Sequence, residues 1–397
     1  MPFTRCRAVQ SAYPRSSSSS SLGCRRLGER HFCYLPRMLK DAVPLEELQR
    51  ALVIKLRHHG DVLLASPVLS VLKSGAPGIE IDALVYDDTA PMLAGHPALA
   101  QLHTVGRAWR AARTTTRIAA EWRLFSALKQ RRYDLIVHLC EHPRGAWLAR
   151  YLGARWSVAP AVPGRSRFWE RSFTHRYPLP KNGRRHQVEL NLDALRRIGL
   201  QPALEDRRAR IVAGDEADRS VTALLAKEGL RERGFVHIHP TSRWRFKCWP
   251  ARQNAELIRA IAERGERVVV TAASDTEECA LVQEILKYAD APVLNLAGKL
   301  SIKELVALIS RAKLSICVDS MPMHVASAVG TPVVALFGPS GDIEWGPWMV
   351  RNAVVTSDHP CRPCGNDGCG GGKVSECLTT LPASRVLAAV ERLLAEQ

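Results

Sequence analysis

Three segments of the chain place acidic, basic and hydroxyl side chains directly after a short apolar run. The first is Lys55-Leu56-Arg57-His58-His59-Gly60-Asp61, which follows the apolar residues 51–54. Gly60 permits a turn that bulkier residues resist, so the Asp61 carboxylate is placed at a strand end, where it could act as a general base. An equally open interpretation is that Asp61 caps a following helix. Ser66-Pro67 is itself a helix-start signature, which would leave Asp61 in the turn.

The second segment, residues 239–250, gathers hydroxyl groups and cations that suit phosphate oxygens. Thr241 and Ser242 supply the hydroxyls, and Lys247 supplies a point charge. Arg243 or Arg245 could add a bidentate contact. The alternative is a solvated basic loop whose two tryptophans only pack.

The third segment follows the apolar run 314–318. Asp319-Ser320 ends that run, and Pro322 starts a helix of small residues whose free N–H groups would accept a diphosphate. Taken singly, Asp319 could be a helix cap and His324 a satisfied helical histidine. Together with the Gly338-Pro339-Ser340 turn, the segment favours anion binding.

Apolar runs alternate with amphipathic segments through most of the chain. The predicted strands are 51–56, 79–85, 134–139, 235–239, 267–271, 314–318 and 332–337, and predicted helices include 253–264, 276–288, 302–311 and 382–395. This alternation predicts parallel sheets covered by helices on both faces. The pattern runs out at 160–182 and weakens at 201–218, so we predict an α/β protein of two doubly wound, Rossmann-like domains. They would be joined near residue 205 and would face an interdomain cleft that holds the ligand.

The predicted division is a leader at 1–45, a first domain at 46–205 and a second at 206–397. The leader is rich in Arg and Ser and contains one acid, Glu29, in its first 37 residues. This composition favours a disordered tail, or a start codon assigned too early with Met38 as the true start. A mitochondrial transit peptide has a similar composition and stays the alternative.

Composition narrows the function classes. With 46% hydrophobic residues among 397, the chain is not wholly disordered, and no apolar run approaches the 18 residues of a membrane span. The net charge of +17 points to an anionic partner, and residues 101–210 hold 23 Lys and Arg against 8 Asp and Glu. No RNA-binding motif or helix-turn-helix spacing accompanies this charge, so we expect no nucleic-acid partner. The scattered cysteines favour a reducing compartment.

Three stretches together resemble a known family. Lys55–Pro67, His239–Pro250 and Val318–Ser340 are similar to the signature regions of the ADP-heptose:lipopolysaccharide heptosyltransferases, and most similar to the heptosyltransferase III group. The resemblance covers about residues 50–395. It implies a GT-B fold and an inverting transfer of L-glycero-D-manno-heptose from ADP-heptose to a hydroxyl of the lipopolysaccharide inner core.

The resemblance also implies a role for individual residues. Asp61 would be the catalytic base, and Lys247 the phosphate-binding lysine. The donor diphosphate would lie against Thr241, Ser242, Lys247, Ser320, Met321 and His324; the ribose or sugar against Asp319 and either Glu277 or Glu278; and the adenine against Leu300. One departure concerns the hydroxyl pair, which some family members carry one residue nearer the lysine.

A fourth cluster consists of Cys361, Cys364, Cys369 and Cys377 in a Gly-rich segment. Four cysteines could hold a structural zinc, but their spacing is not that of a usual zinc finger or ribbon. The resemblance implies a similar Cys-rich loop and no cofactor for transfer. We therefore do not favour zinc.

The expected partners are the ADP-heptose donor and a phosphorylated, lipid-anchored inner-core acceptor. A basic first domain would then face an anionic membrane, with the protein cytoplasmic and peripheral to the inner face of the inner membrane. Two alternatives remain: a GT-B transferase with another nucleotide-sugar donor, and a non-enzymatic, basic binder of anionic surfaces.

Overall fold

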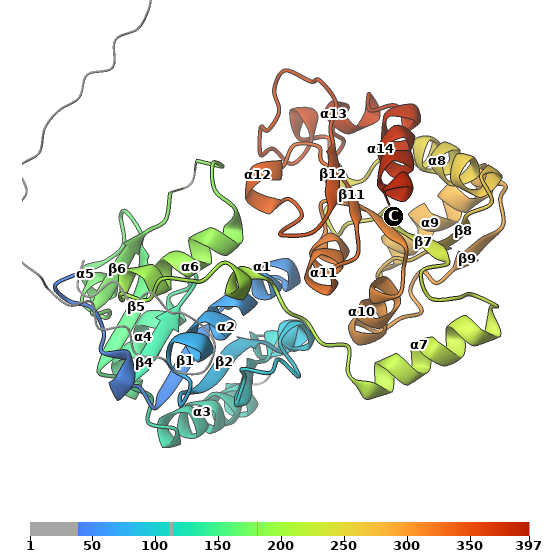
Figure 1. Cartoon of the computed structure of the whole chain (residues 1–397). Coiled ribbons are helices and arrows are strands. Elements are labelled where there is room, and N and C mark those ends of the chain that lie inside the picture. Colours follow the sequence, from blue (N-terminus) through green and yellow to red (C-terminus); the bar gives the residue numbers. More distant parts are fainter. Residues whose placement is uncertain (1–38, 111–113, 181, 397) are drawn as a thin grey trace, which may run out of the picture. The chain divides into compact units, whose positions relative to one another are not determined.

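The computed structural model describes residues 39–110, 114–180 and 182–396 of the chain (Figure 1). The predicted leader lies outside the described residues as far as residue 38. Its last residues belong to the fold: Val43 is 1% exposed, and its N–H donates to the carbonyl oxygen of Ile198 over 3.0 Å. The fold thus begins before the predicted boundary at residue 46, because the apolar side chains of Val43 and Leu45 join the core.

The strands form two sheets. In the described residues, the first half of the chain contains β1 (Arg50–Ile54), β2 (Glu80–Tyr86), β3 (Gln101–Val105), β4 (Leu135–His138), β5 (Trp156–Ala161) and β6 (His175–Pro178). The second half contains β7 (Phe235–His239), β8 (Arg267–Val270), β9 (Val293–Asn295), β10 (Leu314–Val318), β11 (Val333–Leu336) and β12 (Asn352–Val355).

Helices connect these strands. They are α1 (His59–Leu63), α2 (Ser66–Gly75), α3 (Thr114–Gln130), α4 (Arg144–Leu152), α5 (Arg167–Glu170), α6 (Gln187–Arg197), α7 (Asp215–Lys227), α8 (Ala251–Glu263), α9 (Thr276–Ala289), α10 (Ile302–Ser310), α11 (Met321–Val329), α12 (Asp342–Trp345), α13 (Glu376–Thr379) and α14 (Ala383–Ala395). In the described part of the chain, none is both long and apolar enough to span a bilayer.

Both sheets have the same topology. Their strand orders are β3-β2-β1-β4-β5-β6 and β12-β11-β10-β7-β8-β9, and all neighbouring strands are parallel. Each is the doubly wound order in which the chain direction across the sheet reverses beside the first strand. The reversal falls between β1 and β4 in the first sheet and between β7 and β10 in the second. The predicted α/β architecture of two Rossmann-like halves is confirmed.

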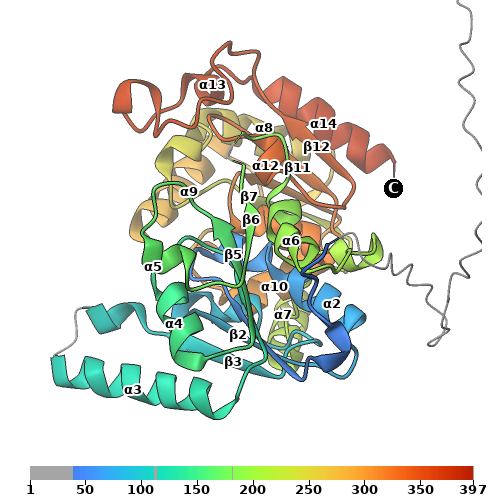
Figure 2. The same ribbon diagram turned by 90° about the vertical axis from the view of Figure 1, so that its left-hand side faces the viewer.

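Each sheet is buried on both faces because successive strand residues point in opposite directions. In β1, Ala51 and Val53 pack against α2 and α6, whereas Leu52 and Ile54 pack against α3 and α4. In the second half, α8, α9 and α14 cover one face and α7 and α10 the other (Figures 1 and 2). Near-continuous apolar strands such as 51–54 are therefore required.

The link between the halves runs from α6 to α7. The predicted boundary near residue 205 lies in this link, and as a domain boundary it stays a prediction. Trp348, from the second half, donates its Nε1–H to the Arg207 carbonyl oxygen over 2.8 Å and stacks on His186, with ring centroids 4.3 Å apart. His186 in turn bonds through Nε2 to the Gly346 carbonyl oxygen. These contacts join the link, and the start of α6, to a loop of the second half.

Candidate active site

Asp61 lies in the first turn of α1, immediately beyond the carboxyl end of β1. The N-caps of α1 and α2 are His58 and Ala65, so Asp61 caps neither helix and the capping interpretation is wrong. The helix predicted to begin at Ser66 does begin there, but the short α1 precedes it. The Asp61 side chain is 12% exposed, and its Oδ1 lies 3.6 Å from Nε of Arg57. A carboxylate that is partly covered yet reachable fits a role in proton transfer.

A buried lysine lies beneath this turn. Lys55 is 3% exposed, and its Nζ donates to the Leu139 carbonyl oxygen and to Oδ1 of Asn191, both over 3.0 Å. Burial lowers the pKa of Lys55, and the nearby Asp61 carboxylate partly opposes this. Asn191 holds α1 as well, because its Nδ2 donates to the Leu64 carbonyl oxygen over 2.9 Å. Sequence reasoning gave Lys55 no role, since an apolar run ending in Lys does not reveal that the lysine stays buried.

The predicted phosphate-binding lysine meets the predicted carboxylate of the third segment. Nζ of Lys247 lies 2.6 Å from Oδ2 of Asp319, although 72 residues separate them in sequence. Lys247 follows β7 and Asp319 follows β10, which are neighbours in the sheet. The side chains are 22% and 7% exposed, so the ammonium group is accessible and the carboxylate is nearly covered.

Thr241 and Glu278 form a second connection at the same edge. The Thr241 hydroxyl donates to Oε2 of Glu278 over 2.6 Å, and the backbone N–H of Ala273 donates to the same oxygen over 3.4 Å. Glu277, by contrast, is exposed. The N-cap of α9 is Asp275, whose Oδ1 accepts from the N–H groups of both glutamates.

A chain of buried hydrogen bonds supports Thr241 from below. His237 bonds to Ser315 and Thr271, each over 2.8 Å, and Thr271 also bonds to His239 over 2.8 Å. His239 Nε2 lies 3.3 Å from the Thr241 hydroxyl. Burial lowers the pKa of both histidines to about 3, so each is neutral at physiological pH. Sequence reasoning assigned neither histidine a role, although His239 is the first residue of the second segment.

The start of α11 carries the remaining predicted anion contacts. Ser320 is the N-cap and makes no side-chain cap bond, so the helix N-terminus is not closed by a side chain, and Met321 is the first helical residue. Asp319 precedes the cap, so its capping interpretation is wrong. Ser242 lies in the β7 loop, 9% exposed, with Oγ accepting from the Trp244 N–H over 3.3 Å.

His324 is buried on α11 without full satisfaction. It is 4% exposed, and among the described residues nothing hydrogen-bonds to its Nδ1. Burial lowers its pKa to about 4, against the opposing charges of Asp319 and Asp61. The interpretation of His324 as a satisfied helical histidine is therefore wrong. A buried polar atom without a partner is costly unless a ligand or water reaches it.

Helix α1 of the first half approaches α11 of the second. A Cβ atom placed on Gly60 would lie 3.0 Å from Cδ2 of His324, so only glycine allows this approach without displacing the imidazole. The loop after β7 also approaches: the charge of Arg243 contributes to lowering the pKa of His58, where burial is the main cause. The structure therefore places Asp61 beside the Lys247, Asp319 and His324 group. A single active site that contains the predicted base and the predicted donor contacts requires these residues to be close together.

Two predicted features lie farther out. Leu300 follows β9 and is half-buried against the core, at the same carboxyl edge as Glu278. Of the clustered cysteines, Cys361, Cys364 and Cys369 are exposed and Cys377 is buried. Within the ranges that the structure describes, no three His, Cys, Asp or Glu side chains are grouped so that they could hold a metal ion. The zinc hypothesis gains no geometric support.

The Cys-rich segment forms hydrogen bonds with the turn that follows β11. Nε of Arg362 donates to the Gly338 carbonyl oxygen over 2.7 Å, and the N–H of Gly365 donates to the Pro339 carbonyl oxygen over 2.9 Å. Sequence reasoning missed Arg362, because no pattern reveals which loop a distant arginine contacts.

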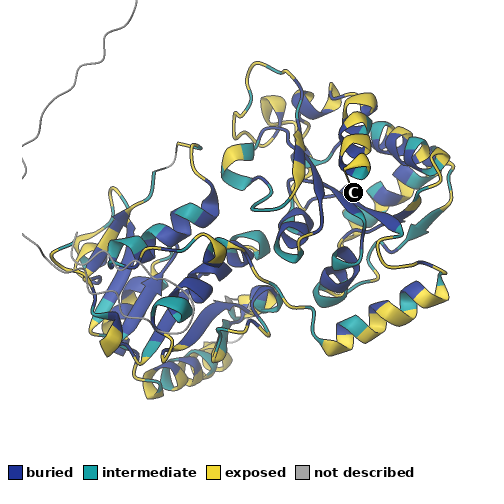
Figure 3. Ribbon diagram, in the orientation of Figure 1, coloured by how far each residue is buried: buried dark blue, intermediate teal, exposed yellow. Residues whose placement is uncertain are grey.

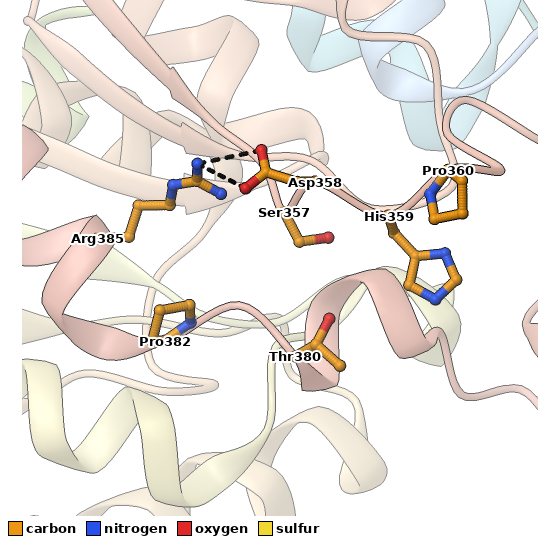
Figure 4. A pocket seen from close by; sticks show the side chains of 7 residues that line it. All are labelled: Ser357, Asp358, His359, Pro360, Thr380, Pro382 and Arg385. Atoms are coloured by element: carbon orange, nitrogen blue, oxygen red, sulfur yellow. Dashed lines mark hydrogen bonds and ion pairs between the residues drawn. The ribbon is translucent and has the colours of Figure 1, made fainter.

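A pocket of about 480 Å³ lies elsewhere in the second half (Figure 4). Its lining residues are Ser357, Asp358, His359, Pro360, Thr380, Pro382 and Arg385. The two opposite charges within it, Arg385 and Asp358, pair with each other over 3.0 Å. None of the predicted site residues lines it, so we assign it no part in the site.

Two doubly wound halves, with a carboxylate at the switch point of one and a lysine at that of the other, define the class of GT-B glycosyltransferases. The model of glycosyltransferase family 9 (heptosyltransferase) matches residues 121–374. Lipopolysaccharide heptosyltransferase 3 of Escherichia coli is 35% identical over 343 residues, which cover 85% of this chain and 97% of that protein. The chain belongs to glycosyltransferase family 9, the heptosyltransferases.

Solved structures agree on the fold. A family 9 glycosyltransferase from Veillonella parvula superimposes with a TM-score of 0.76 at 22% identity, covering 90% of this chain and 100% of that one. An E. coli heptosyltransferase in complex with ADP-2-deoxy-2-fluoro heptose gives a TM-score of 0.68 at 20% identity, over 87% and 99% of the chains.

Proposed function

We propose that this glycosyltransferase moves L-glycero-D-manno-heptose from ADP-heptose to a hydroxyl of the lipopolysaccharide inner core, with inversion at the anomeric carbon. The observation that carries the proposal is the approach of α1 to α11, which brings Asp61 beside the Lys247–Asp319 pair and His324. Family membership supports heptose as the sugar, and the named relative acts on lipopolysaccharide.

The proposed reaction is a single displacement. Asp61 takes the proton from the acceptor hydroxyl as its oxygen bonds to the anomeric carbon, and the bond from that carbon to the diphosphate oxygen breaks. ADP leaves with the electron pair of that bond. Lys247 and the N-terminus of α11 stabilise the charge on the departing diphosphate. The route needs no metal or other cofactor, because these groups already supply positive charge.

We assign the remaining donor contacts from the same geometry. Glu278 is the ribose ligand we favour over Glu277, because it is held by Thr241 at the edge where the donor would lie, whereas Glu277 is exposed. Thr241 then acts by orienting Glu278 rather than as a free phosphate ligand. Ser242, Ser320 and Met321 would contact the diphosphate, and Leu300 the adenine. We also assign His324 to the binding of the sugar-nucleotide donor, because its buried Nδ1 has no hydrogen-bond partner among the described residues.

We further propose that the acceptor is lipid-anchored and phosphorylated, and that the enzyme works on the cytoplasmic side as a peripheral protein of the inner membrane. The surplus of Lys and Arg in residues 101–210 supports an anionic acceptor surface.

Turnover with defined substrates tests the proposal. ADP-heptose, ADP-glucose and UDP-sugars are each supplied with deacylated inner-core acceptors, and product is followed by mass spectrometry. We expect transfer with ADP-heptose alone. Transfer from another nucleotide sugar would favour the alternative GT-B activity, and binding of acceptors without any turnover would favour a non-enzymatic binder.

A further inference from the structure

Four large apolar side chains are exposed on two neighbouring helices of the first half. Ile118 and Trp122 on α3 are 62% and 66% exposed, and Trp147 and Tyr151 on α4 are 64% and 43% exposed. The outer side of α3 is free, since only Leu124 and Leu128 of its 17 residues are buried (Figures 2 and 3). Exposed tryptophans that share one surface usually mark an interaction site.

The two helices form one continuous surface. Ile118 and Trp122 are four residues apart and share a helix face. Phe125, three residues further along that face, contacts Tyr151 with ring centroids 5.5 Å apart. The helices are fixed together by Arg144, whose two Nη atoms each donate to a carboxylate oxygen of Glu121 over 2.6 Å.

Exposed arginines flank these apolar side chains in the sequence. Residues 114–171 contain eleven Lys or Arg and four Asp or Glu. Arg117, Arg123, Arg150 and Arg167 are exposed, and none of them is in an ion pair with another described residue. The guanidinium of Arg150 lies over Phe168, 5.2 Å from the ring centroid, and Phe168 contacts Trp147 at 4.5 Å. We call this surface of Ile118, Trp122, Trp147, Tyr151 and the four arginines the aromatic-basic face.

The aromatic-basic face starts at the active-site end of the sheet and continues toward the opposite edge, because Tyr151 is the eighth of the nine residues of α4. In a parallel sheet each connecting helix runs back against the strands, so the beginnings of α3 and α4 lie at the carboxyl edge. Ile118 and Trp147 belong to the first five residues of their helices. Asp61 lies just beyond the carboxyl end of β1 in the same sheet. A partner bound at Ile118 and Trp147 would therefore lie at the carboxyl edge, the same edge as Asp61.

We propose that the aromatic-basic face docks on an anionic phospholipid bilayer. The proposal rests on the proposed function, because it names the surface through which the enzyme reaches a lipid-anchored acceptor. Trp and Tyr prefer the boundary between headgroups and acyl chains, and arginines around them pair with anionic headgroups. A second copy of the chain fits less well, since a two-fold interface here would bring unpaired arginines together.

Vesicle co-sedimentation of the full chain tests this surface. The vesicles contain phosphatidylethanolamine with roughly a quarter phosphatidylglycerol, or phosphatidylcholine alone. We expect binding to the anionic vesicles that weakens strongly between about 50 and 200 mM salt, and much weaker binding to phosphatidylcholine. The Trp122→Ser/Trp147→Ser double variant should bind at least about tenfold less tightly.

A matched pair of variants separates this face from general hydrophobicity. Ile118→Ser removes a side chain that is 62% exposed on the face, and Ile343→Ser removes one that is 61% exposed on α12. Only the first should weaken vesicle binding. Melting temperature and turnover of a soluble, deacylated acceptor should stay unchanged in all three variants.

Each other result overturns the proposal. Wild-type protein that does not bind vesicles, a double-tryptophan variant that binds like wild type, or equal losses in the two isoleucine variants would each exclude the face as a membrane site. A loss of oligomers in the double variant, measured by light scattering, would assign the face to a second copy. Vesicle binding that behaves as predicted while no transfer occurs would leave this inference standing and reject the proposed function.

Discussion

Gly60 and His324 approach each other so closely that a Cβ atom on the glycine would lie 3.0 Å from Cδ2 of the imidazole. Gly60 belongs to the first half of the chain and immediately precedes Asp61, whereas His324 lies on α11 beside the Lys247–Asp319 pair. The missing side chain therefore lets the proposed base and the donor-binding groups come together.

Gly60→Ala should reduce turnover without unfolding the protein. Alanine has a higher helix propensity than glycine, so α1 itself is not weakened, but the added methyl group must displace the buried His324. We expect kcat/KM to fall about 10–100-fold while the melting temperature changes little. Gly78→Ala is the matched control, because a Cβ atom there would meet nothing within 4 Å. Equal activity of the two variants would show that the close approach is not needed for catalysis.

Lys247→Ala should weaken binding of ADP and of ADP-heptose to the same degree, since the proposed contact is with phosphate. A charge-assisted contact of this kind corresponds to about 10–100-fold in affinity. Lys247→Arg should rescue only part of the loss, because a planar guanidinium does not reproduce the point charge that meets Asp319. Calorimetric titration with ADP measures this, with Arg264→Ala as the control for loss of an exposed ion pair. An unchanged ADP affinity in Lys247→Ala would remove the lysine from the site.

Glu278→Gln and Glu277→Gln separate the two candidate ribose ligands. Glu278 accepts from Thr241 at the carboxyl edge, and Glu277 is exposed on the adjacent position of α9. We expect Glu278→Gln to weaken ADP-heptose binding about tenfold, and Glu277→Gln to leave it near wild type. The reverse order would assign the ribose to Glu277.

Stability should fall as the pH drops from about 6.5 toward 4. The pKa values of His96, His186 and His324 are lowered to about 4 by burial, and those of His237 and His239 to about 3. Unfolded histidines bind protons below about pH 6.5 while these folded ones do not, so acid favours the unfolded state.

In that pH range, each such histidine lowers the free energy of unfolding by up to about 1.4 kcal/mol per unit fall in pH. Urea unfolding at several pH values measures how the free energy of unfolding depends on pH. His96→Gln should reduce this dependence by the contribution of about one proton. A free energy of unfolding that stays flat or rises on acidification would show that these histidines titrate normally in the folded state.

The sequence predicted the central strands well and the outer ones poorly. Residues 235–239 and 314–318 were predicted with the bounds of β7 and β10, because central strands of a parallel sheet are apolar throughout. β3, β5, β6, β9 and β12 were missed. These strands are short or mixed in polarity: β6 is His-Arg-Tyr-Pro, and its side chains alternate between buried and exposed.

The site was predicted at the level of motifs and not of contacts. Asp61 follows a strand of the first sheet, and Lys247 and Asp319 follow strands of the second, so their places at the carboxyl edges of the two sheets could be inferred from topology. No local pattern states that the Lys247 ammonium meets Asp319, that Lys55 is buried beneath Asp61, or that Trp348 stacks on His186. Such contacts depend on tertiary packing between segments 70 or more residues apart.

Asp61→Asn tests the central claim most directly, because it removes the proton acceptor and keeps nearly the same size. The measurement is the single-turnover rate with saturating ADP-heptose and a deacylated acceptor, together with the dissociation constant of ADP-heptose. We predict a rate lower by about 10²–10⁴-fold, equivalent to roughly 3–5 kcal/mol, with donor affinity and melting temperature close to wild type. A variant that transfers heptose at the wild-type rate would contradict the assignment of Asp61 as the catalytic base.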